Sequence, residues 1–303
     1  MKAVVYRRYG SPDVLRLEEV DKPAPADNEI LVKVHATTVA AGDWRMRKPE
    51  PFAARLYNGL LRPKRVTVLG FELAGEVEGT GKDVRRFQRG DRVFAFTGFG
   101  FGAHAQYRCL RESGKITKFG LVAHKPANMS FEQAAAIPVG GLTAQAFLRK
   151  AGVRAGERIL VYGASGSVGT FAVQLANHLS AQVTGVCSSA NLPLVKSPGA
   201  VDVIDYTKDD FATRKGVYDV VFDAVGKTSA SQCRSALKKG GRFVSVMGSA
   251  ALRAGDLDQL KRLVEAGALT PVIDRQYPLE QIAEAHRYVE QGHKRGNVVV
   301  TVH

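Results

Sequence analysis

The sequence predicts an α/β protein in which a β-rich region is joined to a doubly wound parallel sheet. Three observations lead to this prediction. Short β-branched and aromatic runs, punctuated by proline and glycine, fill the first 120 residues. From about Ser130 onward, apolar strands alternate with helical patterns, which is typical of a parallel sheet covered on both faces. A glycine-rich turn joins the first of these later strands to the helix that follows it.

The β-rich region contains several predicted strands. They cover residues 3–7, 15–20, 29–39, 72–81 and 90–96. The prolines of "DKPAPADNE" (21–29) exclude a helix or a central strand there, because proline lacks the N–H group that both need. A helix near 51–61 is expected to interrupt the strands.

The later region opens with a helix for which Ser130 is the predicted N-cap. A proline and two glycines interrupt this helix, and a second helix ends at Gly152. Strands are then predicted at 158–163, 182–187, 201–206, 218–225 and 242–248. Helices at 257–267 and 279–292 and a strand at 297–302 complete the chain.

The composition of the 303-residue chain, with 45% hydrophobic and 24% charged residues, is typical of a soluble protein of two domains. No window approaches the roughly 18 apolar residues of a membrane span. No secretory signal opens the chain, and we therefore expect no membrane partner. The cysteines Cys109, Cys187 and Cys233 lie far apart in the sequence. Their spacing fits neither a disulfide framework nor a zinc site, and it favours a cytoplasmic location.

The net charge of +14 would attract a polyanion. Basic residues are interspersed with acidic ones along the chain and are densest between Arg45 and Arg65. We interpret this stretch as a solvated basic face and expect no nucleic-acid partner. A phosphorylated cofactor would benefit from the same positive field.

The glycine-rich turn matches a dinucleotide-binding fingerprint. Ala164, Gly166 and Gly169 follow the A-x-G-x-x-G variant, with Gly163 just before them and Ser165, Ser167 and Val168 between them. Gly166 would let the backbone approach a pyrophosphate, and Gly169 would let the helix pack closely on the strand. An ordinary glycine turn is the alternative. The strand before, the helix after and the further strand–helix series favour a dinucleotide site.

The residues after the second of these strands suggest which dinucleotide is bound. An NAD site usually has an acidic residue there, which holds the ribose 2′-hydroxyl. This chain has no acidic residue between Arg158 and Val201. The strand is followed instead by the neutral donors Ser188, Ser189 and Asn191, and Tyr206 could add a contact. NADP(H) is therefore the expected cofactor.

Five stretches together resemble one family along essentially the whole chain. They are "PDVLRLEEVDKPAPADNEILVKV", "LGFELAGEVEGTGKDVRRFQRGDRVFAF", "AAAIPVGGLTA", "ILVYGASGSVG" and "RGNVVVTV". The chain resembles the medium-chain dehydrogenase/reductase superfamily, and within it the zinc-independent quinone oxidoreductase (ζ-crystallin-like) branch. The resemblance implies a GroES-like catalytic domain at 1–122 and 271–303, a Rossmann NADP-binding domain at 123–270, and hydride transfer between the two. It also implies that Thr143, Met247, Gly248 and Ser249 approach the nicotinamide and that Asn297 contacts the cofactor.

Zinc-dependent relatives carry a cysteine shortly before an aspartate, and a G-H-E motif. This chain has Ala40 and Ala41 before Asp43, and Phe71 in place of the histidine. No metal site is therefore expected. Without a metal, hydride transfer to a simple ketone lacks its electrophile, whereas a quinone or an α,β-unsaturated carbonyl spreads the developing charge onto oxygen. Such a conjugated carbonyl compound is the expected small-molecule partner.

Substrate-pocket candidates come from the loops that carry substrate contacts in relatives. "FAFTGFGFGAHAQY" supplies Phe94, Phe96, Phe99, Phe101 and Tyr107, as an aromatic wall or as ordinary strand core. Asp43 could line the pocket or cap a helix, and Trp44 could line it too. His104 could donate a proton or could have a structural role. No catalytic residue is assigned from the sequence.

One departure from the family concerns assembly. Only "ALRAG" separates "RFVSVMGSA" from the next helix, which is too short for the loop and sixth strand that commonly form the dimer contact. The resemblance implies a homodimer, and this short connection removes its usual contact strand. Two alternative functions stay open at this point. One is an NAD(P)-dependent alcohol or aldehyde dehydrogenase, and the other is a low-turnover ζ-crystallin-like protein that binds NADPH or nucleic acid.

Overall fold

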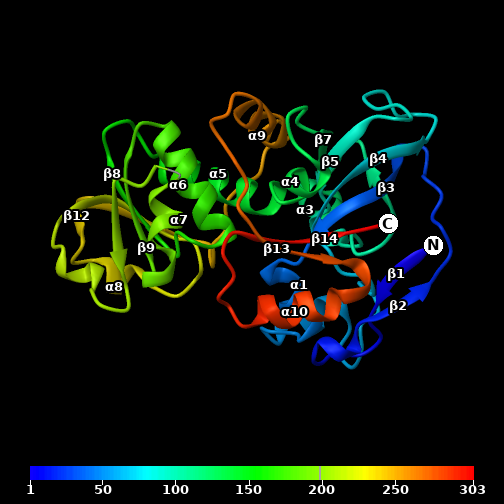
Figure 1. Ribbon diagram of the computed structural model, residues 1–303, viewed down its shortest axis with the longest axis horizontal. Helices are drawn as coiled ribbons and strands as arrows, with labels where there is room; N and C mark the ends of the chain where they lie inside the picture. The colour runs from blue at the N-terminus through cyan, green and yellow to red at the C-terminus, as the bar shows by residue number, and fades with distance from the viewer. Residues whose placement is uncertain (198) are drawn as a thin grey trace. The chain divides into compact units, whose positions relative to one another are not determined.

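The computed structural model describes residues 1–197 and 199–303, and its contacts divide the chain into two compact units (Figure 1). The first unit comprises 1–139, 257–261 and 273–303. The second comprises 140–256 and 262–272. The domain boundaries expected from the sequence, 1–122 with 271–303 and 123–270, stay a prediction. The compact units place 123–139 with the first unit.

The first unit is built on a seven-stranded sheet to which both ends of the chain contribute. The path runs in the order β13-β14-β3-β4-β5-β7, and β6 pairs with β3. The strands are β3 (Glu29–Thr38), β4 (Glu72–Thr80), β5 (Arg92–Phe96), β6 (Tyr107–Arg111), β7 (Leu121–His124), β13 (Ile273–Pro278) and β14 (Asn297–Thr301). β14 runs antiparallel to β3, with Val300 opposite Thr37, so the C-terminal strand completes the sheet of the N-terminal region. A separate hairpin joins β1 (Lys2–Val5) to β2 (Arg16–Glu19).

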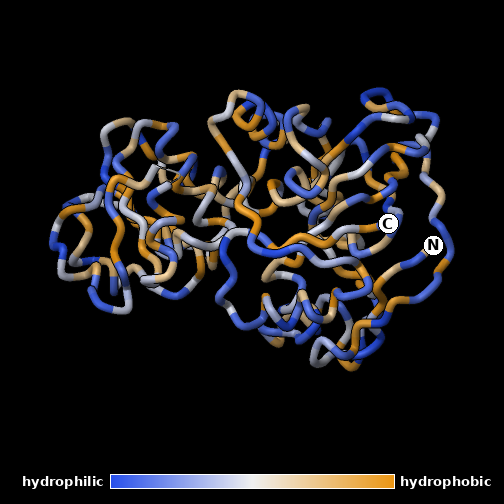
Figure 2. Tube along the Cα trace, in the orientation of Figure 1, coloured by the Kyte–Doolittle hydropathy of each residue, from blue (hydrophilic) through white to orange (hydrophobic). Residues whose placement is uncertain are grey.

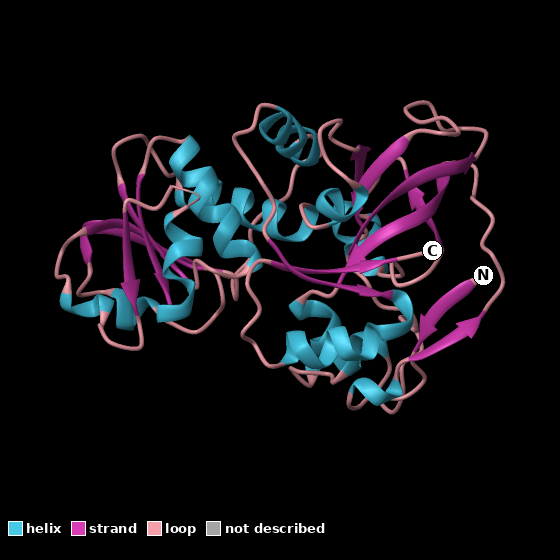
Figure 3. Cartoon of the chain, in the orientation of Figure 1, coloured by secondary structure: helices cyan, strands magenta, loops and turns pink. Residues whose placement is uncertain are grey.

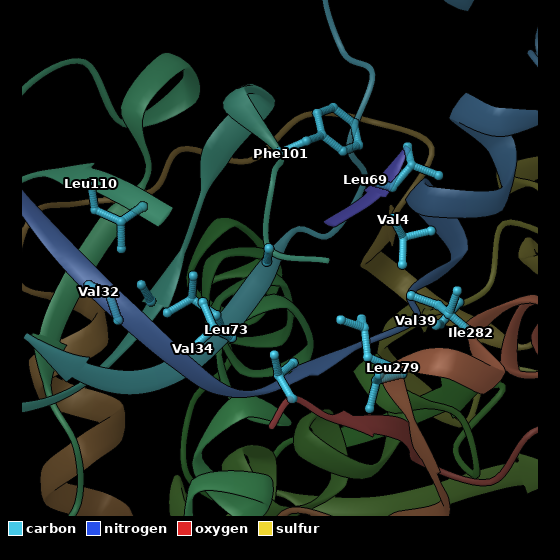
Figure 4. Close-up of a cluster of buried hydrophobic side chains, with 14 of the residues drawn as sticks. Val4, Val32, Val34, Val39, Leu69, Leu73, Phe101, Leu110, Leu279 and Ile282 are labelled. Carbon is cyan, nitrogen blue, oxygen red and sulfur yellow. The ribbon is translucent and has the colours of Figure 1, made fainter. Parts of the chain in front are cut away.

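Buried aliphatic side chains from distant segments form the core of this unit. Val32 and Val34 of β3, Leu73 of β4 and Leu110 of β6 are buried in one hydrophobic cluster, together with Val4 near the N-terminus. Figure 4 shows these side chains with others from the same cluster. Figure 2 shows that hydrophobic stretches follow the strands, whereas the connecting loops are more hydrophilic. Burial of these apolar side chains on one face fixes the register of the strands in the sheet.

Short helices connect the strands of the first unit (Figure 3). They are α1 (Ala41–Arg47), α2 (Ala53–Asn58), α3 (Ile116–Phe119), α4 (Phe131–Ala135) and α10 (Ile282–Glu290). The helix expected at 51–61 is present as α2. The Ser130 side chain accepts a hydrogen bond from the backbone N–H of Gln133, which confirms the predicted N-cap of α4. Strands β6 and β7 and helix α3 were not expected from the sequence.

The second unit contains a five-stranded parallel sheet in the order β10-β9-β8-β11-β12. The strands are β8 (Arg158–Tyr162), β9 (Gln182–Cys187), β10 (Asp202–Asp205), β11 (Tyr218–Asp223) and β12 (Leu237–Ser245). When these five strands are numbered from 1 to 5 in chain order, beginning at β8, the order across the sheet is 3-2-1-4-5. This is the Rossmann arrangement, and it confirms the predicted fold class. Helices α5 (Pro138–Ala151), α6 (Ser167–His178), α7 (Leu192–Lys196), α8 (Ala230–Cys233) and α9 (Asp256–Glu265) occur along this part of the chain.

The sheet of the second unit lacks a sixth strand within the described residues. The chain passes from the end of β12 at Ser245 to the start of α9 at Asp256 without strand structure. This agrees with the short connection in the sequence. Within the same residues, no helix is both long enough and apolar enough to cross a membrane.

A buried arginine links three separate segments of the first unit. Arg47 of α1 is fully buried; its guanidinium donates hydrogen bonds to the carbonyl oxygen of Gly10 and to the carboxylate of Glu290 in α10. A charge removed from water in this way must be paired to be tolerated. Arg47 therefore holds α1, α10 and the N-terminal loop together.

We predict that Arg47→Met lowers the free energy of unfolding by about 3 kcal/mol, because both charge-assisted hydrogen bonds are lost and their half-buried acceptors lose this partner. Urea unfolding followed by circular dichroism measures this change. Arg45→Met, at an exposed position of the same helix, is the matched control and should change stability by about 0.5 kcal/mol or less. Equal losses in the two variants would contradict the role given to Arg47.

Candidate functional site

The loop between β8 and α6 is built by main-chain hydrogen bonds. The backbone N–H groups of Gly163 and Ala164 both donate to the carbonyl oxygen of Val186 in β9, at 3.0 Å each. Gly163 has a φ of +79°, a conformation that glycine adopts without strain. The backbone N–H of Gly166 donates to the carbonyl oxygen of Gly163 at 3.1 Å. The loop thus turns sharply and delivers the chain to the start of α6.

The glycines of this loop have distinct steric roles. A Cβ atom at Gly169 would lie 2.2 Å from the carbonyl oxygen of Gly163, so only glycine lets α6 approach the loop this closely. At Gly166 the nearest atom to such a Cβ is 3.6 Å away, an ordinary van der Waals distance, so this position is not crowded. Gly166 is also the N-cap of α6, and no side chain caps it. An open helix N-terminus with uncapped N–H groups suits a phosphate group, so the residues present fit a dinucleotide.

The segment after β9 lies beside this loop. The Asn191 side-chain amide donates to the hydroxyl groups of Ser165 and Ser188, at 3.2 Å each. The backbone N–H of Tyr206, after β10, donates to the carbonyl oxygen of Cys187 at the end of β9. The structure therefore brings Ser165, Ser188, Asn191 and Tyr206 together, although they come from the ends of three strands. The Tyr206 side chain is exposed.

Asp205 is an acidic residue in this region that the sequence reasoning missed. It lies at the end of β10, where the hydroxyl groups of Ser189 and Thr207 donate to its carboxylate. These hydrogen bonds lower the pKa of Asp205 below its usual value. Ser189 is therefore engaged by a carboxylate and is not a free donor for a phosphate. Asp205 lies beyond the stretch 158–201 that has no acidic residue, but the sheet places the end of β10 beside the end of β9.

A second buried aspartate organises the ends of β11 and β12. Asp223 accepts hydrogen bonds from the backbone N–H groups of 225–228 and from the hydroxyl of Ser245 at 2.9 Å. Ser245 in turn accepts from the backbone N–H of Met247, whose side chain is exposed. The Lys150 ammonium donates to the carbonyl oxygen of Ser249 at 2.7 Å. Asp223 thus supports the start of the segment 247–249, which is expected near a nicotinamide, through the Ser245 hydroxyl.

The other two expected cofactor residues lie elsewhere. Thr143 is half-buried on α5 of the second unit. Asn297 is buried at the start of β14 in the first unit. Their part in cofactor binding stays a prediction.

Phenylalanines gather where the resemblance would place a metal ligand. The Phe71 ring lies 4.1 Å from Phe101, 6.2 Å from Phe96 and 6.5 Å from Phe99, measured between centroids. It also packs against α1, since a Cβ at Gly42 would lie 2.2 Å from its Cε2 atom. Of the predicted aromatic wall, Phe96, Phe99 and Phe101 thus contact Phe71. Phe94 is buried in the sheet and Tyr107 is half-buried on β6.

Asp43 is completely buried and serves the backbone. Its carboxylate accepts hydrogen bonds from the N–H groups of Ala40 and Gly70, at 2.8 Å each. This geometry supports the helix-capping alternative for Asp43, and it also ties the loop before α1 to the loop before β4. Burial raises the pKa of Asp43 to about 7. The neighbouring Trp44 is half-buried against the core of the first unit.

His104 is buried as well, which supports its structural alternative. Its Nε2 lies 2.9 Å from the carbonyl oxygen of Thr38, and its ring meets that of His286 edge-on at 5.7 Å. Burial lowers the pKa of His104 to about 4. The imidazole is therefore neutral near pH 7.

Glu72 is a buried carboxyl that the sequence reasoning did not select. It accepts hydrogen bonds from the Thr38 hydroxyl and from the backbone N–H of Val139, so it joins β3, β4 and the start of α5. Burial raises the pKa of Glu72 to about 7. Within the described residues, no group of three or more His, Cys, Asp or Glu side chains is arranged to hold a metal ion.

Comparisons with known proteins place this geometry in a family context. Residues 26–121 match the alcohol dehydrogenase GroES-like domain, and residues 167–266 and 246–300 match two families of zinc-binding dehydrogenases. A 2-methylene-furan-3-one reductase from Solanum lycopersicum is 34% identical over 99% of this chain and 79% of its own length. A chloroplastic NADPH-dependent alkenal/one oxidoreductase from Arabidopsis thaliana is 33% identical over the same shares. The quinone oxidoreductase structure from Coxiella burnetii has a TM-score of 0.84 and 28% identity, covering 100% of this chain and 99% of its own.

We predict that Glu72→Gln removes a pH dependence of stability. A carboxyl whose pKa is raised by folding stabilises the protein below its usual pKa of 4.5, and this contribution is lost as the pH rises through about 7. Relative to Glu72→Gln, the wild type should therefore lose roughly 3 kcal/mol of unfolding free energy between pH 4.5 and pH 8. Urea unfolding at several pH values measures this difference.

Glu76→Gln, on the same strand β4, is the matched control for a general effect of charge. If the stability difference between wild type and Glu72→Gln stayed constant across this pH range, the raised pKa would be refuted.

Proposed function

This chain belongs to the medium-chain dehydrogenase/reductase superfamily, in the quinone oxidoreductase branch, and from this premise we propose that it is an NADPH-dependent reductase of quinones or α,β-unsaturated carbonyl compounds. The observation that supports the proposal most directly is the glycine loop at the N-terminus of α6. Similarity to the named relatives supports the substrate class.

The main chain at the start of α6, from Gly166 onward, would hold the pyrophosphate of the cofactor, because Gly166 is not crowded by other atoms and no side chain caps this helix end. Ser188, Asn191 and Tyr206 would contact the adenosine end, and Thr143 with 247–249 would contact the nicotinamide end. When bound, the nicotinamide supplies the hydride. The residues of this chain bind and orient it; Asp223 acts on 247–249 through Ser245 and is a positioning residue.

Ser188 and Asn191 support NADPH over NADH. Both are neutral hydrogen-bond donors in the segment after β9, and neither is bonded to a carboxylate in the contacts described above. The nearby carboxylate of Asp205 is engaged by Ser189 and Thr207, and the Lys208 ammonium lies 4.0 Å from it. These partners offset its charge, so a 2′-phosphate would meet less repulsion than the acidic residue alone would cause.

The residue types around Phe71 support a conjugated acceptor. Ala40, Ala41 and Phe71 stand at positions where zinc-dependent relatives carry ligands, and alanine and phenylalanine cannot coordinate a metal. The exposed Phe99 and its neighbours Phe71 and Phe96 offer an apolar surface to a flat substrate. A conjugated acceptor delocalises its developing charge, so neutral hydrogen-bond donors suffice to stabilise it. His104 and Asp43 are buried and bonded to the backbone, so we assign the final proton to solvent.

The reaction class is tested by following nicotinamide absorbance with a panel of quinones, enals, saturated ketones and alcohols. We expect turnover with the conjugated acceptors only, and no loss of activity after treatment with a chelator. Oxidation of saturated alcohols that a chelator abolishes would contradict the proposal. Absence of turnover with every acceptor would do so too.

The cofactor preference is tested by Ser188→Asp. A carboxylate at this position would repel the 2′-phosphate of NADPH, and NADH lacks that group. The variant should weaken NADPH binding at least about tenfold more than NADH binding, measured by titration with each cofactor. Ser188→Asn, which keeps a neutral donor, is the control. An equal effect of the aspartate on both cofactors would remove Ser188 from the 2′-phosphate site.

A further inference from the structure

Large apolar side chains are exposed along one short segment of the first unit. Among the residues that the structure describes, four of the ten exposed large hydrophobic side chains fall between positions 52 and 61. Their exposed fractions are 64% for Phe52, 76% for Leu56, 56% for Leu60 and 87% for Leu61. Single exposed apolar residues are ordinary, but several exposed apolar side chains within ten residues are typical of a surface that binds a partner.

Phe52 and Leu56 lie at the start of α2 and within it, and Leu60 and Leu61 lie in a loop that is anchored at its base. We call residues Gly59–Lys64 the Leu60 loop. Buried Asn58 precedes it: its side-chain amide donates to the Tyr6 hydroxyl, and its side-chain oxygen accepts from the backbone N–H groups of Arg65 and Val66. The Tyr9 hydroxyl donates to the carbonyl oxygen of Gly59 at 2.7 Å. These bonds hold both ends of the loop, so the leucines are presented by a fixed support.

Positive charge surrounds these apolar side chains. Arg62, Lys64 and Arg65 are exposed within or just after the Leu60 loop, and Arg45 and Lys48 are exposed on α1 and at its end. The sequence has no acidic residue from 51 to 71. The segment therefore combines protruding apolar side chains with a basic rim. Lys48 is paired with Glu50 and Glu290, so the positive charge of this rim is carried by Arg45, Arg62, Lys64 and Arg65.

We propose that α2 and the Leu60 loop dock on the surface of an anionic phospholipid bilayer. Leucine and phenylalanine side chains would enter the boundary between headgroups and acyl chains, as the apolar faces of interfacial segments do. The basic rim would meet the negative surface potential of the lipid. The expectation of no membrane partner concerned segments that cross a membrane, whereas this contact involves one leaflet and requires no spanning helix. The proposal is independent of the proposed reaction, because it concerns binding alone.

Two other occupants fit the same surface less well. A twofold contact with a second copy would place the basic rim of one chain against the basic rim of the other, and like charges across an interface repel. A single-stranded nucleic acid would use the charges but stacks its bases on aromatic rings, whereas three of the four exposed side chains are leucines. Charge and aliphatic character together favour a lipid surface.

The experiment is co-sedimentation of the full chain with phosphatidylcholine vesicles, with and without phosphatidylserine. We expect binding only to the vesicles that contain phosphatidylserine, and binding that weakens as salt increases. Leu60→Ser with Leu61→Ser should weaken it about tenfold, because the apolar contribution is lost. Arg62→Gln with Lys64→Gln should weaken it by a similar factor.

Matched controls come from other exposed sites. Val201→Ser removes an apolar side chain that is 70% exposed in the second unit, and Lys239→Gln removes an exposed basic one. Both should bind like the wild type, and unchanged melting curves would show that every variant is folded.

Binding that persists in the double leucine variant would mean general charge attraction and would overturn the proposal. The proposal would also fail if no vesicle bound, or if the double leucine variant instead abolished self-association or RNA binding in the absence of vesicle binding.

Discussion

The close approach of α6 to the loop after β8 is the contact on which the candidate nucleotide site depends. It exists because residue 169 has no side chain: a Cβ there would overlap the carbonyl oxygen of Gly163. This contact fixes the N-terminus of α6 at Gly166, and Ser165 lies within hydrogen-bond reach of Asn191, which follows β9. The fit of the candidate site to a phosphate group thus follows from main-chain geometry, and polar side chains lie at its edges.

Buried carboxyl groups hold the backbone in place in both units. Asp223 accepts from four backbone N–H groups after β11, Asp43 accepts from the backbone before α1 and before β4, and Glu72 accepts from the backbone at the start of α5. Asp43 links the loops that carry Ala40 and Phe71, the positions of metal ligands in zinc-dependent relatives. The support for those loops is therefore present, while the residues on them are alanine and phenylalanine. In the proposed reaction, the reactivity comes from the cofactor and from the conjugation of the substrate.

The first unit has two groups of apolar side chains, one packed around Phe71 and one exposed between positions 52 and 61. Phenylalanines around Phe71 are packed on each other and on α1, whereas Leu56, Leu60 and Leu61 are held out of the core by the bonds of Asn58. Tyr57 connects the two regions, because its hydroxyl donates to the carbonyl oxygen of Phe99 at 2.8 Å. Hydropathy of the segment alone does not separate the packed side chains from the exposed ones.

The sequence by itself determined the features that depend on neighbouring residues. Strand and helix periodicity, the Ser130 cap, the glycine fingerprint and the missing sixth strand are all local, so they could be read from short stretches. Tertiary structure decided which distant groups meet. Asp205 reaches Ser189 across 16 positions because parallel strands align their carboxyl ends, and the burial of Asp43 and His104 depends on segments far along the chain. Burial and long-range hydrogen bonding are set by sheet register and packing, and a single local pattern does not contain them.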